Sequence, residues 1–353
     1  MGLWLAFGVL TAAVVVSRCA QETPEQLWKA GVNARFAGMS DEEKKRFVGS
    51  APLSRSNAVS KMEMPLMEAV GLPESFNAAD RWPECAQSIN TVRDQGSCSS
   101  GWASASAAAM SDLTCIRCAA KVSPYLSEQD LLTCCPSCGN CETGGDVKVA
   151  FLYWVTDGLV TGGPVNSSQG CQPYTLSSQA GSIPECSRTC QPGYPVSYDK
   201  DKRKGSVYGP ISGESAIKTA IYTYGSVVVA SFKVYDDFQT TYKDGIYHYV
   251  SGDLKGVQAV KVIGWGVDNN VPYWLAVNSW GTDWGMKGFF KIKRGTNECD
   301  FEASAVQGIA TTDACVSIST TPHPTTAASS AVKSMLNAIL VLLPVSVAAR
   351  MLF

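Results

Sequence analysis

The sequence of 353 residues has almost no histidine and no block of charge of one sign. Lysine and arginine number 29 against 31 aspartates and glutamates, so the formal net charge is -2. A chain without a basic excess lacks the electrostatic footprint of nucleic-acid binding, and its charge names no other partner. The whole sequence has two histidines, His248 and His323. Few residues are therefore available for histidine-based metal binding or for acid–base catalysis by histidine.

Fourteen cysteines are the most unusual feature that is present. Cys135 and Cys138 have the spacing of two zinc ligands, but no second, equally spaced pair accompanies them. The apolar stretch Gly2–Val16, followed by small residues, is typical of a secretory signal, although it lacks a preceding Lys or Arg. Secretion means an oxidising compartment and therefore disulfides. We expect a signal peptide over residues 1–20 and no metal or cofactor.

The C-terminal end is hydrophobic as well. The apolar run Met335–Ala349 is shorter than the roughly 20 residues that a membrane-spanning helix needs. It follows a Ser-, Thr- and Pro-rich stalk, residues 316–334, which contains the small-residue run Ala327–Ala331. Small residues, a polar spacer and a hydrophobic tail, here residues 335–353, are the pattern of a GPI-anchor signal. The alternative is a flexible linker and a short membrane helix, which Arg350 favours. Either reading attaches the chain to a membrane.

Composition divides the remaining chain into two parts. Residues 21–71 are charged and have no cysteine, with a helix expected over Ser40–Phe47. Residues 72–315 form one compact region with two kinds of periodicity. Helices are expected over Trp102–Cys115, Ser127–Thr133 and Asp146–Thr156, and strands over Ser226–Phe232, Gly245–Val250, Ala259–Val267, Tyr273–Asn278 and Gly288–Arg294. A helical half followed by a β half predicts an α+β fold with a cleft between two lobes.

Three short stretches carry the signal for function. Asp94–Trp102 reads Asp-Gln-Gly-Ser-Cys-Ser-Ser-Gly-Trp, Gly256–Gly266 contains Gly-Val-Gln-Ala-Val and Gly-Trp-Gly, and Asn278–Gly285 reads Asn-Ser-Trp-Gly-Thr-Asp-Trp-Gly. Together they resemble the motifs of cathepsin B-like cysteine peptidases of the papain family. The resemblance extends from about Trp28 to Ile309 and implies the papain-like fold, with a helical lobe, a β-rich lobe and a cleft between them.

The resemblance places two substitutions in the catalytic machinery. A thiol peptidase needs a cysteine at a helix N-terminus, a histidine to share its proton, an amide to orient that histidine and donors for the oxyanion. The nucleophile position is Gly101 and the general-base position is Gln258. Gln95 matches the oxyanion donor, and Asn278 would have oriented the missing histidine. Losing a nucleophile or base costs on the order of a millionfold in rate, so we interpret the chain as a catalytically inactive homologue.

The cleft itself is expected to remain. Its walls, by resemblance, are Ser99, Ser100, Gly144, Gly145, Trp280 and Ser304. Ser304 stands where an acidic residue of the second specificity pocket is expected, and the stretch from Cys171 to Cys186 lacks the paired histidines of cathepsin B. Ser100 could replace the nucleophile, but an unassisted hydroxyl is a weak one.

The resemblance also implies a propeptide and a set of disulfides. The propeptide is residues 21–71, with the motif Trp-Lys-Ala-Gly beginning at Trp28 and a mature start at Leu72. The implied disulfides are Cys85–Cys115, Cys98–Cys141, Cys134–Cys186, Cys135–Cys138 and Cys171–Cys190. Cys118, Cys299 and Cys315 have no assigned partner.

Three functions remain open at this point. The cleft could bind a peptide or protein ligand without cleaving it, such as a substrate-like peptide, a cystatin-type inhibitor or the chain's own propeptide. Weak hydrolysis could persist through Ser100. The chain could instead be a surface glycoprotein with an unused cleft, since Asn166 lies in a glycosylation sequon. All three place it in the secretory pathway, with an extracellular, lysosomal or cell-surface destination.

Overall fold

The computed structural model describes residues 27–51, 71–176 and 183–316. The expected signal peptide lies outside these residues, as do the tail and all of the stalk beyond Val316. Among the described residues, no helix has both the length and the apolar character needed to cross a membrane.

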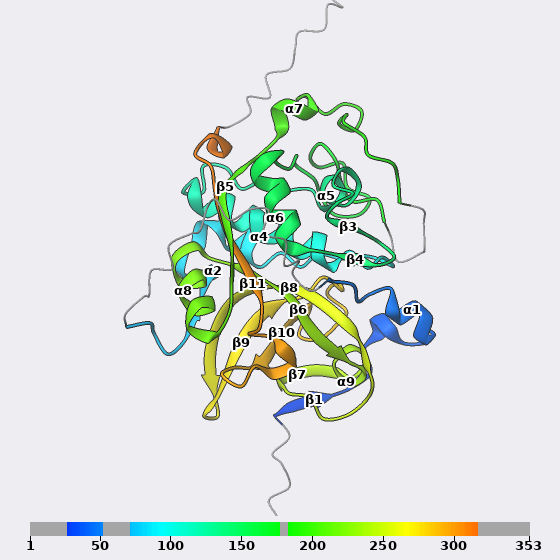
Figure 1. The fold of residues 1–353 in the computed structure, drawn as a ribbon, viewed down its shortest axis with the longest axis vertical. Coiled ribbons are helices and arrows are strands. Elements are labelled where there is room, and N and C mark those ends of the chain that lie inside the picture. The colour runs from blue at the N-terminus through cyan, green and yellow to red at the C-terminus, as the bar shows by residue number, and fades with distance from the viewer. Residues whose placement is uncertain (1–26, 52–70, 177–182, 317–353) are drawn as a thin grey trace, which may run out of the picture.

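The described helices and strands form two lobes (Figure 1). The helices are α1 Asp41–Lys45, α2 Ala78–Arg81, α3 Ala86–Ile89, α4 Gly101–Arg117, α5 Glu128–Cys134, α6 Val147–Thr156, α7 Tyr198–Asp201, α8 Glu214–Tyr224 and α9 Asp236–Thr240, with 3-10 turns η1 Ala34–Phe36, η3 Pro83–Cys85, η4 Glu298–Asp300 and η5 Asp313–Cys315. The strands are β1 Trp28–Ala30, β2 Phe76–Asn77, β3 Gly139–Asn140, β4 Gly144–Gly145, β5 Gly205–Ile211, β6 Val227–Tyr235, β7 Tyr242–Tyr247, β8 Leu254–Asp268, β9 Val271–Val277, β10 Phe289–Lys293 and β11 Ala305–Ala310.

The central element of the helical lobe is α4. Its first two-thirds is nearly all alanine, serine and glycine, so neighbouring elements can pack closely around it, and it is buried from Gly101 to Cys115. The adjoining helices begin as their sequences predict. Ser127 caps α5 by accepting from the Asp130 amide, and Asp146 caps α6 by accepting from the Lys148 and Val149 amides. The helix α4 therefore has a fixed position against the sheet, which it meets along β8 and β11.

The β-rich lobe is built on one large sheet. Within the described residues its strand order is β1-β7-β10-β9-β8-β6-β11-β5, with β2 paired to β8. One face holds a cluster of aromatic rings, in which Trp280 and Trp284 meet edge to face with centroids 4.9 Å apart. The long central strand β8 carries position 258 from this lobe toward α4. The α+β, two-lobe expectation is confirmed.

The division into a helical half and a β half is less strict than the sequence suggests. The helix α8 lies in the second half of the chain, and its apolar residues pack into the core of the β lobe. Strands β5 and β11, which the periodicity did not indicate, extend the sheet toward the helical lobe. The first strand, β1, comes from the N-terminal segment and pairs antiparallel with β7. These additions tie both lobes and the N-terminal segment to one sheet.

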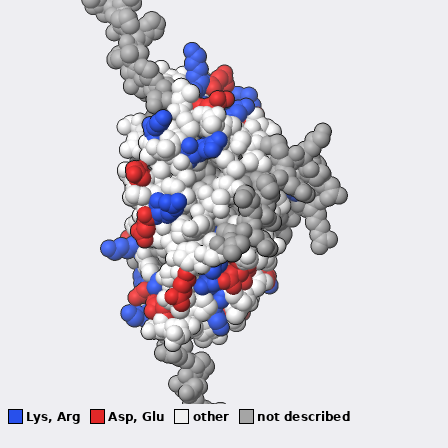
Figure 2. Space-filling model, turned by 90° about the vertical axis from the view of Figure 1, so that its left-hand side faces the viewer, with Lys and Arg blue, Asp and Glu red and all other residues white. Residues whose placement is uncertain are grey.

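Charge of both signs is mixed on the face of the molecule that Figure 2 draws. On the face drawn in Figure 2, basic and acidic side chains are interspersed, and neither sign gathers over one element. This mixture agrees with the near-zero net charge of the sequence, and the face drawn has no patch that would attract a polyanion.

The disulfides fix the helical lobe. The five pairs that the resemblance implies are all present: Cys85–Cys115, Cys98–Cys141, Cys134–Cys186, Cys135–Cys138 and Cys171–Cys190. A sixth bond joins Cys118, directly after α4, to Cys315 near the end of the described chain, across 197 residues of sequence. Cys299 remains a free, half-buried thiol.

We expect the sixth disulfide to stabilise the fold substantially. Replacing both Cys118 and Cys315 by serine should lower the free energy of unfolding by about 2–5 kcal/mol, because the bond restricts the unfolded chain. Urea unfolding of the full chain would measure this. Cys299→Ser, which removes a thiol outside any disulfide, is the control and should change the midpoint little. Equal midpoints for all three proteins would show that the bond contributes nothing.

Candidate active site

Positions 101 and 258, to which the resemblance assigns the nucleophile and the general base, lie against each other. Gly101 is the first residue of α4, and Gln258 lies on β8 with its side chain fully buried. A Cβ atom placed on Gly101 would lie 2.5 Å from Gln258 Nε2 and 2.7 Å from Gln258 Cδ. Real Cβ atoms do not approach other atoms so closely. The amide of Gln258 thus occupies the space that any side chain at position 101 would need.

The Gln258 amide belongs to a network of neutral polar groups. Its Nε2 donates to Gln95 Oε1 at 2.9 Å, and lies 3.4 Å from both Asn278 Oδ1 and Ser279 Oγ. Ser279 Oγ donates to the same Gln95 oxygen at 2.7 Å. The structure therefore brings Gln95, Gly101, Gln258 and Asn278 together, as the sequence predicts. None of their side chains titrates, so none can take a proton from a nucleophile.

Ser100 is held away from any base. It is buried, and its hydroxyl lies 2.9 Å from the Tyr174 hydroxyl. Tyr174 in turn donates to the Gln95 carbonyl at 2.8 Å, so Ser100 must donate to Tyr174. Burial raises the pKa of Tyr174, which keeps that phenol protonated. His248 is no substitute: it follows β7, its carbonyl accepts from Trp28 Nε1, and its Nδ1 has no hydrogen-bond partner in the described residues.

The N-terminal segment fills the cleft. In Figure 1 it runs from β1 through α1 to the junction of the lobes beside β4. The carbonyl oxygen of Phe47 accepts from Trp280 Nε1 at 2.8 Å and from Gln95 Nε2 at 3.3 Å. Two residues later the chain passes so close to β4 that a Cβ on Gly144 would lie 2.8 Å from the Gly49 Cα. Gln95, Trp280 and Gly144, which the resemblance places in the cleft, are therefore in contact with residues of Phe47–Ala51.

Backbone hydrogen bonds hold the segment on both sides. The Ser50 amide donates to the Val257 carbonyl at 3.2 Å, and the Ala51 amide donates to the Gly145 carbonyl at 2.8 Å. The segment lies as closely on Ser99, because a Cβ on Gly49 would lie 2.9 Å from the Ser99 carbonyl oxygen. Glycine is thus required on both sides of this contact, at position 49 and at position 144.

Side chains anchor the segment further back. The guanidinium of Arg35 makes two bonds to the Asp94 carboxylate, one of them at 2.8 Å. The ring of Phe36 meets Phe47 and Trp280 edge to face, with centroids 5.1 and 5.2 Å apart. The segment is therefore attached by ionic, aromatic and backbone contacts at once.

Two expected cleft residues, Ser100 and Ser304, make no side-chain hydrogen bond to the segment among the described residues. Ser304 is half-buried, and its hydroxyl has no hydrogen-bond partner in the described part of the chain. Sequence reasoning also missed four residues that matter: Phe47, Tyr174, Gln239, which donates to the Lys44 carbonyl at 2.9 Å, and Ser279. No motif marks the first three, whereas Ser279 stands inside the Asn-Ser-Trp motif beside Asn278.

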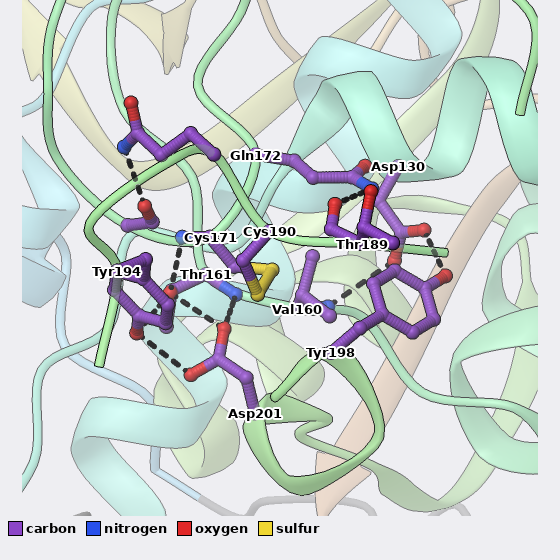
Figure 3. Close-up of a disulfide and its surroundings, with 12 residues drawn as sticks. Asp130, Val160, Thr161, Cys171, Gln172, Thr189, Cys190, Tyr194, Tyr198 and Asp201 are labelled. Atoms are coloured by element: carbon purple, nitrogen blue, oxygen red, sulfur yellow. Dashed lines mark hydrogen bonds between the residues drawn. A yellow bond between two sulfur atoms is a disulfide. The ribbon is translucent and has the colours of Figure 1, made fainter. Parts of the chain in front are cut away.

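The resemblance places the paired histidines of cathepsin B between Cys171 and Cys186. Described residues at the two ends of this stretch are held by the contacts drawn in Figure 3. The Cys171–Cys190 bond lies beside Thr161, whose hydroxyl donates to Asp201 at 2.7 Å. Gln172 reaches across to the Thr189 carbonyl at 3.3 Å. The described residues of this region offer no histidine, and no group of metal-ligating side chains occurs anywhere in the described chain.

Comparison with known proteins gives consistent matches. Residues 72–309 match the model of the papain family cysteine protease. Cathepsin B-like cysteine proteinase 3 of Caenorhabditis elegans is 46% identical over 249 residues, which are 68% of this chain and 66% of that protein, just under two thirds. A cathepsin B-like cysteine proteinase of Schistosoma japonicum is 38% identical over 307 residues, 82% and 88% of the two chains. Among solved structures, procathepsin B S9 from Trypanosoma congolense superposes with a TM-score of 0.70 at 34% identity, covering 81% of this chain and 94% of that one.

The contact between positions 101 and 258 predicts coupled mutations. Gly101→Cys should destabilise the fold by about 1–3 kcal/mol, because the new side chain overpacks against Gln258. Gln258→Ala removes the obstruction, so the double variant should be less destabilised than the sum of the two single variants, with a coupling of about 0.5–3 kcal/mol. Urea unfolding of the four proteins measures that coupling.

The control is a second double-mutant cycle, in which Gly101→Cys is combined with Gln87→Ala, a change at an exposed residue. That pair should be additive. Additivity in the first cycle as well would show that the Gln258 amide does not occupy the space of a side chain at position 101.

Proposed function

The chain belongs to the papain family of cysteine proteases and is cathepsin B-like, and we propose that it is a catalytically inactive member whose cleft binds peptide or protein without cleaving it. The observation that carries the proposal is the Gln258 amide in the space of the nucleophile's side chain. Thiol proteolysis requires a thiolate and a base that shares its proton. Neither group is present at Gly101 or Gln258, and the oxyanion donors alone leave only about a thousandfold over water.

The cleft retains what a peptide ligand needs. Gln95 and Trp280 present two donors to one carbonyl, and the backbones of Gly145 and Val257 accept from the amides of an extended chain. This arrangement recognises extended peptide through its main chain. The segment within residues 21–71 is the first such ligand, and we assign it as a propeptide. A chain without a nucleophile cannot cleave off its own segment. A second peptide or a cystatin-type inhibitor can therefore enter the cleft only by displacing the segment, or after another protease has removed it.

A role as a surface glycoprotein is the second candidate. Asn166 is exposed, with a positive φ of 61° in a turn, so the sequon is open to glycosylation. Six disulfides support passage through the secretory pathway. We assign residues 72–315 to the folded domain, and residues 316–334 and 335–353 to a stalk and a GPI-anchor signal or short membrane helix. In this role the filled cleft has no ligand other than the chain itself.

Turnover of a fluorogenic dipeptide substrate tests the loss of activity. The full chain, before and after an added protease has removed its N-terminal segment, should be on the order of a millionfold slower than an active family member. Gly101→Cys combined with Gln258→His should regain turnover and label with a thiol-reactive epoxide. Turnover by the unmodified chain that disappears in Ser100→Ala would overturn the proposal.

Affinity for a cystatin-type inhibitor tests the binding role. Gly49→Ala should loosen the segment, because its Cβ would collide with Ser99. A cleft that is free more often should bind the inhibitor about tenfold more tightly. Val32→Ala, an exposed change in the same segment, is the matched control and should leave the affinity unchanged. If no inhibitor binds even after the segment has been removed, the surface-glycoprotein role is favoured.

A further inference from the structure

A small cavity lies directly behind the vestigial active site. Its volume is about 10 Å³, which is the space of one water-sized occupant. Ser104 from α4 lines it, together with Lys261 from β8 and Asn278 after β9. Arg93, which precedes the Asp-Gln-Gly stretch of the active site, closes another side.

Three of the lining side chains have a polar atom without a partner in the described residues. These atoms are Arg93 Nε, Ser104 Oγ and Asn278 Nδ2. The side chains are almost completely inaccessible, with 4%, 0% and 2% of their residues' surface exposed. Leaving a buried donor unsatisfied costs about 1–3 kcal/mol, and three such atoms on residues that line one cavity favour an occupant there. The two nitrogens can only donate, and the hydroxyl is free to donate. The occupant must therefore accept hydrogen bonds.

The charge around the cavity favours an anion over a neutral acceptor. Two cationic side chains, Arg93 and Lys261, line the cavity, and no carboxylate does among the described residues. Each cation already has a carboxylate on another side: Arg93 bonds to Glu128, and Lys261 lies 2.8 Å from Asp112. Because the two carboxylates offset part of the positive charge but do not line the cavity, a monovalent ion suits the site better than a multivalent one.

We propose that this cavity binds one small monovalent anion such as chloride, held by Arg93 Nε, Ser104 Oγ and Asn278 Nδ2. Thr91, Arg93 and Ala108 also line a neighbouring pocket of about 210 Å³. Binding of the ion fixes the Asn278 amide with nitrogen toward the ion and oxygen toward the Ser279 amide and Gln258. The site goes beyond the proposed cleft function, because the peptide-binding donors of Gln95 and Trp280 do not line the cavity.

Halide-dependent stability tests the site. The melting temperature of the full chain should rise with chloride or bromide, and saturate, relative to sodium gluconate at the same ionic strength. Crystals grown with bromide should show an anomalous peak in the cavity. Ser104→Ala should weaken the halide effect about tenfold, since it removes one hydrogen bond to the ion.

Ser106→Ala is the matched control for this test. Ser106 lies on the same helix, is equally buried and also lacks a partner in the described chain, but it does not line the cavity. The control should keep the full halide effect. Equal melting temperatures in halide and gluconate, a loss shared by both variants, or an anomalous peak without any thermal effect would each overturn the proposal.

Discussion

Everything at this site depends on the packing of one buried amide against a residue that has no side chain. Gln258 can point toward α4 only because position 101 is glycine, and position 101 can carry no side chain while Gln258 points there. Glycine at position 101 and glutamine at position 258 are therefore sterically linked. The result is a site in which the space beside Gly101 is filled by a neutral group with fixed hydrogen bonds.

That amide also determines how the cleft meets a peptide. Because Gln258 and Ser279 both donate to Gln95 Oε1, the Gln95 side chain must turn its nitrogen the other way, toward the Cys98 carbonyl and the Phe47 carbonyl. Trp280 supplies the second donor to the same Phe47 oxygen. The clamp on the bound segment is thus set by neutral groups, whose hydrogen bonds do not depend on a proton equilibrium.

The sequence predicts local structure here better than long-range contact. Capped helices such as α5 and α6 can be read from single residues, Ser127 and Asp146, since the cap and the helix are neighbours in the chain. The disulfide partner of Cys118 could not be read from the sequence in this way. Cys118 and Cys315 are 197 residues apart, and only the folded chain brings them together. The vestigial residues were identifiable by resemblance, but the contact between Gly101 and Gln258 and the fit of Gly49 against Gly144 depend on packing between distant segments.

The Gln258 amide is not the side-chain group that would stabilise the fold most in the space beside Gly101. Its oxygen is buried without a hydrogen-bond partner in the described residues, which costs about 1–3 kcal/mol. An apolar side chain of similar shape would avoid that cost, but it would leave Gln95 Oε1 with Ser279 as its only side-chain donor. What the glutamine provides is its nitrogen, which holds Gln95 in the orientation that binds a peptide carbonyl. A polar residue at this place is therefore better explained by the geometry of binding than by the stability of the fold.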